Sequence, residues 1–465
     1  MDMNLTITVL AIVTVLTHHS LSLTIADRTR GLNNASSSSV GFSLPLVANL
    51  EPSLDHHTVH RSSDGFLNFH HRLGGGAPAA SNVTAAAAIP PLEIGPELHV
   101  NIGTGSGQQH VVLKYDTTGS LTWLQCDPCT PKARQLGPLF VPHLSPTYRD
   151  IEATSPSCST LFEPDPATGK CTFRMRKTGI NVKGVVARDH VAVATAGGNV
   201  IEDYLFGCVY DTQLFKNDRR YAGVFVNSRA PYSFVSQGVA RGVTRFSYCI
   251  SGEFEAANRR HGFLRFGTDV PHNPGYRTTG ILPALRAHET AYYVSLVGVS
   301  LGTRRLDMIR PEMFRRREDD GGQGGCIVDI GTPLTVMARD AYRIIEEAVW
   351  ADLRSYDHGA EQVKRVDYSL CVRATTEAIK GHLPSLSLHF AGEGEEEATL
   401  VVSPEQLFLI MEDEQPAVRI IACLAMASGP RTVVGALQQV DTRFVFDLKD
   451  NKLYFAPESC TRDTA

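Results

Sequence analysis

The sequence predicts a mostly β protein made of two similar lobes with a cleft between them. From Leu98 onward, short β-rich runs alternate with turn signals almost to the end of the 465-residue chain. Two segments, "VLKYDTTGSLTW" at Val112 and "CIVDIGTPLTVM" at Cys326, also share one pattern: an apolar strand, an Asp, a Gly/Thr turn and then Leu-Thr. The two aspartates, Asp116 and Asp329, are 329 − 116 = 213 residues apart, about one lobe's length. Two such lobes would present both carboxylates at their interface.

The N-terminus predicts a signal peptide over residues 1–26. The stretch "LTITVLAIVTVLT", from Leu5 to Thr17, is an apolar run too short to cross a bilayer comfortably, and polar residues follow it. The residues before it include Asp2 and no Lys or Arg, which is unusual for a secretory signal. A short membrane anchor is the alternative. No later stretch is long and apolar enough to span a membrane, so the mature chain is expected to have no span.

Residues 27–93 lack a periodic apolar pattern and are expected to form a pro-segment or flexible leader. They contain Ser36 to Ser39 and a His-rich patch of His56, His57, His60, His70 and His71. The histidines could bind metal, but a disordered pro-segment is the simpler interpretation. Sequons at Asn34 and Asn82 fit a secreted chain.

The net charge and the cysteine content limit which partners and which compartment are expected. The net charge of −5 and the pI of about 6.4 give no reason to expect nucleic acid or an anionic membrane as a partner. Ten cysteines follow the signal, which predicts an oxidising compartment and disulfides. A zinc site at Cys126-x-x-Cys129 is the alternative, although no second Cys or His pair lies at metal spacing.

Two aspartates held close together in a poorly solvated cleft can act as an acid–base pair in catalysis. Two close carboxylates cannot both ionise cheaply, so they share one proton, and near acidic pH one acts as acid and the other as base. Such a pair can activate a water against a peptide carbonyl without a metal, a cofactor or a covalent intermediate. The sequence therefore predicts no cofactor and no metal.

The chain from about Leu98 to Cys460 resembles the pepsin-like aspartic proteases, in particular the plant nepenthesin-like branch. The resemblance rests on "VNIGTG" before the first Asp, "LTWLQCDPC" after it, "FGC" at Phe206, "FSYCISG" at Phe246, "CIVDIGTPLTVMARDAY" at Cys326 and "VVGALQQVDTRFVFDLKDNKLYFAPESC" at Val433.

This resemblance implies a bilobal pepsin-like acid-protease fold with an N-terminal lobe over residues 94–275 and a C-terminal lobe over residues 276–465. It implies that Asp116 and Asp329 are the catalytic pair, and that a polypeptide substrate or protein target lies in the cleft. A monomer, secreted to the apoplast or delivered to the vacuole, is expected. The family's habits suggest three disulfides: Cys126–Cys129, Cys249–Cys460 and Cys371–Cys423.

The catalytic loops depart from the family's pattern, which is Asp-Thr/Ser-Gly-Thr/Ser in both lobes. Thr117, Gly331 and Thr332 match it and are expected to support the two carboxylates. Counted back from Trp123, however, Thr118 stands where the Gly belongs and Gly119 where the second hydroxyl belongs, and Ile330 replaces the hydroxyl of the second loop. Alternatively, one Thr was inserted and one residue was lost after Ser120, so that "TGS" is intact but shifted by one residue relative to Asp116.

Two further departures lie in the first lobe. The family's flap carries a Tyr, and the alignment on Gly184 and Asp189 places Arg176 there; a one-residue shift brings in Lys177 instead. In addition, "YAGVFVNS" offers Val226 where the family has a Gly beneath the first Asp loop.

The functional prediction is an aspartic-type endopeptidase, active at acidic pH, whose activity is weak or lost. The alternative is a non-catalytic binding protein on the same fold, such as a glycosidase inhibitor. A serine hydrolase is not supported, because "GTGSG" at Gly103 lacks the Gly-x-Ser-x-Gly spacing.

One helix is expected over residues 338–350, where Tyr342, Ile345 and Val349 lie near helical spacing.

Overall fold

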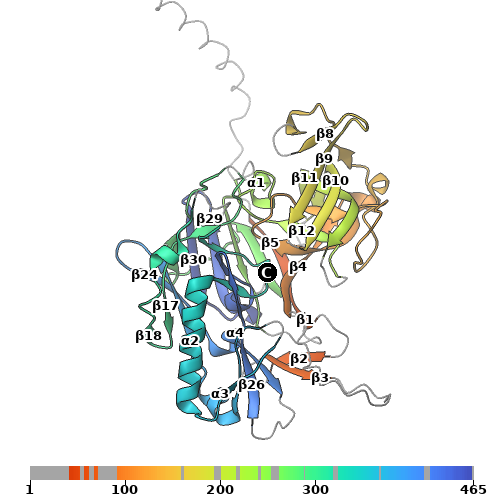
Figure 1. Ribbon diagram of the computed structural model, residues 1–465. Coiled ribbons are helices and arrows are strands. Elements are labelled where there is room, and N and C mark those ends of the chain that lie inside the picture. The colour runs from red at the N-terminus through yellow and green to blue at the C-terminus, as the bar shows by residue number, and fades with distance from the viewer. Residues whose placement is uncertain are drawn as a thin grey trace, which may run out of the picture. The chain divides into compact units, whose positions relative to one another are not determined.

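The computed structural model describes residues 41–52, 57–61, 67–71, 92–158, 162–177, 179–192, 200–215, 220–238, 242–252, 261–286, 288–317, 323–365, 368–412 and 419–462. The expected signal peptide and both sequons lie outside these residues. Strands dominate the described chain (Figure 1). The mostly β fold class is therefore confirmed.

The largest sheet has fifteen strands and contains most of the first half of the protein. Fourteen of them are adjacent in this order: β15 (Arg277–Gly280), β30 (Lys452–Pro457), β29 (Thr442–Asp447), β13 (Arg245–Cys249), β14 (His261–Gly267), β1 (Gly41–Pro52), β4 (Leu92–Ile102), β5 (Gln109–Asp116), β12 (Gly223–Val226), β6 (Trp123–Gln125), β11 (Val200–Phe215), β10 (Ile180–Ala192), β9 (Lys170–Lys177) and β8 (Glu163–Asp165). The fifteenth strand, β7 (Arg149–Asp150), pairs with β10.

Three smaller sheets contain most strands of the second half. The five-stranded sheet has the order β16 (Tyr293–Val294), β19 (Cys326–Val328), β28 (Thr432–Val434), β20 (Thr335–Ala338) and β27 (Met426–Gly429). The four-stranded sheet has the order β18 (Arg304–Arg305), β17 (Leu296–Leu301), β23 (Leu386–Ala391) and β24 (Glu397–Val402). The six-stranded sheet has the order β2 (His57–Arg61), β3 (Leu67–His71), β25 (Phe408–Glu412), β26 (Arg419–Leu424), β22 (Cys371–Thr375) and β21 (Glu361–Gln362).

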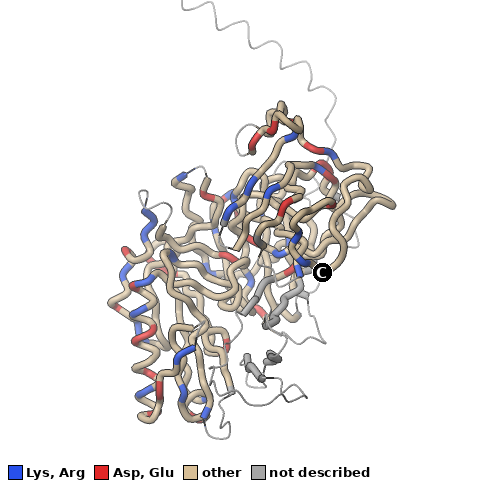
Figure 2. Tube along the Cα trace, turned by 45° about the vertical axis from the view of Figure 1, so that its right-hand side comes forward, with Lys and Arg blue, Asp and Glu red and all other residues tan. Residues whose placement is uncertain are grey.

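The α-helices described are α1 (Phe234–Gly238), α2 (Arg339–Tyr356), α3 (Thr376–His382) and α4 (Pro404–Leu407). The helix expected over residues 338–350 is confirmed as α2, which continues to Tyr356. Its buried face carries Tyr342, Ile345 and Val349. Charges of both signs lie along α2, so its polar face is balanced (Figure 2).

The two halves repeat one arrangement of four strands around each Asp loop. In the first half the order is β5, β12, β6 and β11; in the second half it is β19, β28, β20 and β27. Within each set the first pair is parallel, the second antiparallel and the third parallel. The internal echo in the sequence therefore corresponds to a real structural repeat, with Asp116 at the end of β5 and Asp329 directly after β19.

Strand register aligns the two loops residue by residue. Trp123 faces Val224 in the first half, and Val336 faces Val433 in the second. These residues lie equally far beyond their aspartates, since 123 − 116 = 7 and 336 − 329 = 7. The loops have equal length, so in this register Gly119 corresponds to Thr332. A Thr insertion balanced by the loss of one residue after Ser120 would give the same length, and that alternative stays a prediction.

The strand β1 lies inside the stretch expected to be a leader. It pairs with β14 through Gly41 to Val47 and with β4 through Leu46 to Pro52. Phe42, Leu44 and Leu46 are almost completely buried. The expectation of a coreless leader therefore does not hold for this strand, although the pro-segment assignment of residues 27–93 stays a proposal.

Four disulfides are present in the described chain: Cys126–Cys208, Cys158–Cys171, Cys249–Cys460 and Cys371–Cys423. The last two were predicted and are confirmed. The predicted Cys126–Cys129 bridge is wrong, because β6 and β11 lie parallel and bring Cys126 beside Cys208. Cys129 is a buried free thiol, and the zinc interpretation of this pair fails with its partner oxidised.

Among the described residues, no helix has both the length and the apolar character needed to cross a bilayer.

Candidate active site

The first carboxylate is held by the turn that follows it. Asp116 Oδ1 accepts hydrogen bonds from Thr118 N (2.7 Å), Thr118 Oγ1 (3.1 Å) and Gly119 N (2.6 Å). All three reach the same oxygen. No described residue donates a hydrogen bond to Oδ2, which leaves that oxygen available to a water or a substrate atom.

The second carboxylate is buried and is held at both oxygens. Asp329 Oδ1 accepts from Thr117 Oγ1 (2.9 Å), Thr117 N (3.3 Å) and Gly331 N (3.1 Å). Its Oδ2 accepts from Thr332 Oγ1 at 2.6 Å. All four bonds come from the three residues that the sequence predicted to support the carboxylates: Thr117, Gly331 and Thr332.

The two carboxylates meet at Gly331. This residue donates its N–H to Asp329, and a Cβ placed on it would lie 2.9 Å from Asp116 Oδ2 and 3.2 Å from Asp116 Cα. Only a glycine lets the second loop come this close to the first. Burial, and then the negative charge of Asp116, raise the pKa of Asp329, while its hydrogen bonds act in the opposite direction. The structure thus brings the two predicted aspartates together.

The hydroxyl interlock between the loops is present in one direction. Thr117, which is fully buried, donates to Asp329 Oδ1 and accepts the backbone N–H of Ile330 at 3.3 Å. It also lies 3.4 Å from the carbonyl oxygen of Val328. The residue that corresponds to Thr117 in the second loop is Ile330, whose buried side chain has no hydroxyl to offer. The second loop therefore offers no hydroxyl to the first, and only Thr117 links the two loops through a hydroxyl.

Gly119 and Val226 form a matched pair beneath Asp116. Val226 pairs with Asp116 in register, and a Cβ on Gly119 would lie 2.6 Å from Val226 Cγ2. The Val side chain therefore occupies the space that a Ser or Thr at position 119 would need. The first loop has no side-chain hydroxyl at the position of Thr332.

The flap hairpin, strands β9 and β10, places Arg176 away from the core. Arg176 pairs with Asn181 near the turn and is exposed, whereas Met175 packs against the core cluster that contains Trp123. Successive residues of a strand point to opposite faces. Arg176 does not come together with the aspartates in the manner of a flap Tyr, and the inward-facing position is Met175.

Trp123 is a core residue. It is 1% exposed, and its ring makes an edge contact with Phe215 at 4.8 Å between centroids. Phe215, at the end of β11, is therefore an aromatic neighbour of Trp123.

Sequence reasoning missed two hydroxyls that support the first loop from outside. Thr290 donates to the Thr118 carbonyl oxygen, and Ser228 donates to the Gly119 carbonyl oxygen at 2.6 Å. Ser228 follows Val226 closely in "VFVNS", so its place beneath the loop had a local signal. Thr290 lies far away in sequence, and no local pattern marks it.

Two family models match the chain. Xylanase inhibitor N-terminal matches residues 99–268, and Xylanase inhibitor C-terminal matches residues 291–457. Together they cover 170 + 167 = 337 of the 465 residues.

Curated relatives support the same grouping. The chain is 29% identical to Aspartyl protease family protein 2 of Arabidopsis thaliana, over 78% of this chain and 71% of that protein. It is 28% identical to Aspartic proteinase nepenthesin-2 of Nepenthes gracilis, over 78% and 77% of the two chains.

Solved structures share the fold. "Crystal structure of edgp" matches with a TM-score of 0.62 at 15% identity, covering 93% of this chain and 98% of that one. Basic 7S globulin from soybean matches with a TM-score of 0.62 at 18% identity, covering 92% and 100%. At these identities the likeness concerns the fold alone.

The repeated strand sets and the facing Asp loops define a pepsin-like β protein. The chain belongs to the pepsin-like aspartic protease family, in the plant branch of the nepenthesins, with altered catalytic motifs.

Proposed function

We propose that this protein is a secreted or vacuolar aspartic-type endopeptidase that hydrolyses polypeptides slowly at acidic pH. The observation that carries the proposal is the shared contact of both carboxylates with Gly331. Asp116 and Asp329 are the catalytic residues, Thr117, Gly331 and Thr332 support them, and no cofactor is required. The chain acts as a monomer, with its lobes over residues 94–275 and 276–465 after removal of the signal peptide.

The two aspartates have different roles. Asp329, whose pKa is raised, holds the shared proton, and Asp116 is the base with a free Oδ2. Asp116 takes a proton from water as the water oxygen bonds to the peptide carbonyl carbon, and Asp329 gives its proton to the carbonyl oxygen. When the tetrahedral species collapses, Asp116 returns its proton to the departing amine and Asp329 takes back the hydroxyl proton. Both carboxylates end as they began.

Slow turnover follows from the first loop and the flap. Asp116 has no hydroxyl from position 119 to fix its orientation, and Arg176 does not close over the substrate. Small errors in orientation are costly, since a displacement of about 1 Å can reduce the rate about 100-fold.

The test is hydrolysis of an unfolded protein at pH 3–5 by the purified full chain. We expect activity above background that a statine-type peptide, a mimic of the tetrahedral intermediate, inhibits. Asp329→Asn should abolish it, because one carboxylate cannot serve as acid and base, whereas Asp340→Asn on the exposed start of α2 should leave it within about 2-fold. Activity that survives Asp329→Asn would contradict the proposed dyad.

The second candidate function is a non-catalytic binding protein, such as a glycosidase inhibitor. Val226 in the space beneath Asp116 and Ile330 in the interlock favour it, because both replace catalytic support by apolar packing. Inhibition of a microbial xylanase on xylan by the wild type, together with no hydrolysis of protein at any acidic pH, would favour this function over the first.

A further inference from the structure

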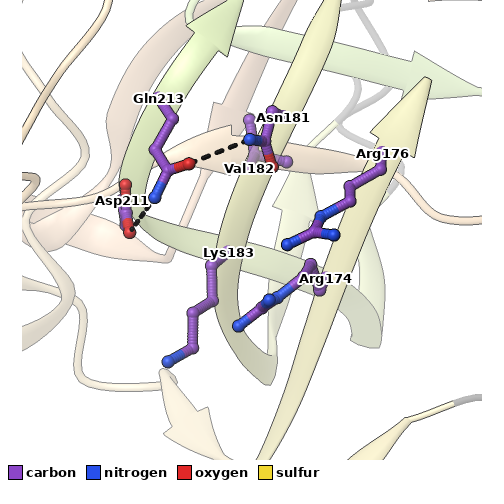
Figure 3. Close-up of a pocket in the computed structure, with 7 residues that line it drawn as sticks. All are labelled: Arg174, Arg176, Asn181, Val182, Lys183, Asp211 and Gln213. Carbon is purple, nitrogen blue, oxygen red and sulfur yellow. Dashed lines mark hydrogen bonds between the residues drawn. The ribbon is translucent and has the colours of Figure 1, made fainter.

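The outer face of the flap hairpin carries three cations. Arg174 and Arg176 lie two residues apart on β9, and Lys183 on β10 pairs directly with Arg174. Figure 3 shows the three side chains on one side of the sheet, with Asn181 and Gln213 beside them. We call Arg174, Arg176 and Lys183 the cationic face. It lies opposite Met175, so it is not part of the core or of the Asp pair.

The cationic face is not neutralised by the described protein. None of its three cations has an ion-pair partner within 4 Å among the residues that the structure describes. Arg174 and Arg176 are exposed, and Lys183 is half-buried with its Nζ 5.6 Å from the centre of the Tyr210 ring. Asp211 lines the same depression and Lys183 also acts on Asp165, so carboxylates balance the three cations only in part. The charges on α2, in contrast, are of both signs (Figure 2).

The spacing of the cations fits an extended chain. Residues two apart on a strand lie about 6.7 Å from each other on the same face. Alternate side chains of an extended peptide have the same separation, so carboxylates at alternate positions can meet Arg174 and Arg176 together. The depression between the cations holds about 40 Å³, which suits single carboxylate groups and not a bulky ligand. Arg also binds carboxylates through two parallel hydrogen bonds.

The amide pair beside the cations completes a polypeptide site. Asn181 donates to Gln213 Oε1 at 2.9 Å, and both amides retain donors and acceptors that a peptide backbone can use. We propose that the cationic face is an exosite that binds an extended acidic segment of a partner protein, with Asp or Glu at alternate positions. The exosite does not depend on whether the aspartates are catalytically active.

The test measures binding of a fluorescent peptide, (Glu-Ser)4, to the full chain by anisotropy. We expect (Gln-Ser)4 to bind at least 10-fold more weakly, and the affinity for (Glu-Ser)4 to fall as salt rises from 25 to 200 mM, because exposed charges are screened. The triple variant Arg174→Gln/Arg176→Gln/Lys183→Gln should lose at least 10-fold. The matched control, Arg304→Gln/Arg310→Gln/Arg343→Gln, removes three exposed cations elsewhere and should remain within 2-fold.

Several outcomes overturn the exosite. Equal binding of (Glu-Ser)4 by the wild type and the triple variant, with unchanged thermal unfolding, would exclude the cationic face. Equal affinity for polygalacturonate would show a general anion site instead of a polypeptide site. Concentration-dependent self-association that the triple variant loses would identify a second copy of this chain, whose Glu393–Glu397 stretch is acidic, as the occupant in place of a partner protein.

Discussion

The first Asp loop has Gly119 where the second has Thr332, and the strands beneath them have Val226 and Gly435 at corresponding positions. In the second loop, Gly435 is packed against the backbone of Leu334 and Thr335, where a Cβ would come within 2.3–2.7 Å, and Thr332 bonds its carboxylate. In the first loop, Val226 fills the space beneath Gly119, and position 119 has no hydroxyl. The first loop has therefore kept its packing while losing a polar contact.

This comparison indicates that the first loop did not simply decay. A lone loss of the hydroxyl would leave a void, and interiors are close-packed, so voids destabilise. Here the larger side chain lies on the strand, at Val226, and the glycine lies in the loop, at Gly119. Other groups of the first loop also compensate, since the Gly119 N–H and the Thr118 hydroxyl both donate to Asp116.

The largest effect is expected from exchanging this pair. Val226→Gly should lower the free energy of unfolding by about 3 kcal/mol, because a fully buried Val is lost and a Gly enters a strand. Gly119→Ser alone should cost about 1–3 kcal/mol through its contact with Val226. The double variant should be more stable than the sum predicts by at least ~1 kcal/mol, measured by urea unfolding. It should also hydrolyse protein about 10-fold faster at pH 4.

Additive losses in that double-mutant cycle would show that the two residues do not share one space. A stable double variant with unchanged activity would show that the orientation of Asp116 does not limit the rate.

The second largest effect is expected at the contact between Thr117 and the second Asp loop. Thr117→Val should destabilise the protein by about 2 kcal/mol, because Asp329 Oδ1 and the Ile330 N–H both lose a buried partner. The matched change in the second loop, Ile330→Val, should cost about 0.5–1.5 kcal/mol, since it removes only a methylene. Thermal unfolding measures both. A larger loss of stability for Ile330→Val than for Thr117→Val would show that apolar packing stabilises the contact between the loops more than the hydrogen bonds do.

A pH-dependent effect is expected at Asp329. Because its folded pKa is raised above its unfolded value, the folded state holds the proton more strongly, so stability falls as pH rises from about 4 through the folded pKa. Asp329→Asn removes the buried charge. The difference in Tm between variant and wild type should thus become more positive from pH 3 to pH 7, by about 2 °C for each kcal/mol.

The same series on Asp340→Asn, at the exposed start of α2, provides the comparison for loss of an exposed carboxylate. A decreasing difference for Asp329→Asn would mean that the lost Thr332 and Thr117 contacts outweigh burial.

The smallest effect is expected at the flap hairpin of the first lobe. Arg176→Tyr should leave hydrolysis within about 2-fold, because Arg176 faces outward from the hairpin. Met175→Tyr, on the inward face, should raise it a few-fold by excluding water near Trp123. The rate on an unfolded protein at pH 4 measures both, and a larger gain for Arg176→Tyr would contradict the observed face.

The features that the sequence predicted correctly are those with a local periodic pattern or a repeated motif. The strand-rich texture, α2 and the meeting of Asp116 with Asp329 all followed from periodicity and from the repeated Asp-loop pattern. The Cys249–Cys460 and Cys371–Cys423 pairings followed from family resemblance and are confirmed.

The features that the sequence did not predict depend on contacts between segments that are far apart in the chain. Cys126 meets Cys208 because two distant strands lie parallel, whereas the family resemblance had suggested Cys129 as its partner. The direction of Arg176 depends on the register of its hairpin, where a shift of one residue exchanges the two faces. The strand β1 did have a signal, the alternation of Phe42, Leu44 and Leu46, but polar and low-complexity sequence surrounds it.

The position of β1 has a consequence for the maturation of the chain. It is an interior strand, hydrogen-bonded on one side to β14 and on the other to β4. A protease that cuts between Pro52 and Leu92 severs the backbone but leaves this strand held by both neighbours and by its buried Phe42, Leu44 and Leu46. Such a cut yields a two-chain molecule in which the short N-terminal fragment remains as a structural subunit, and removing it would open two unsatisfied strand edges in the middle of the largest sheet.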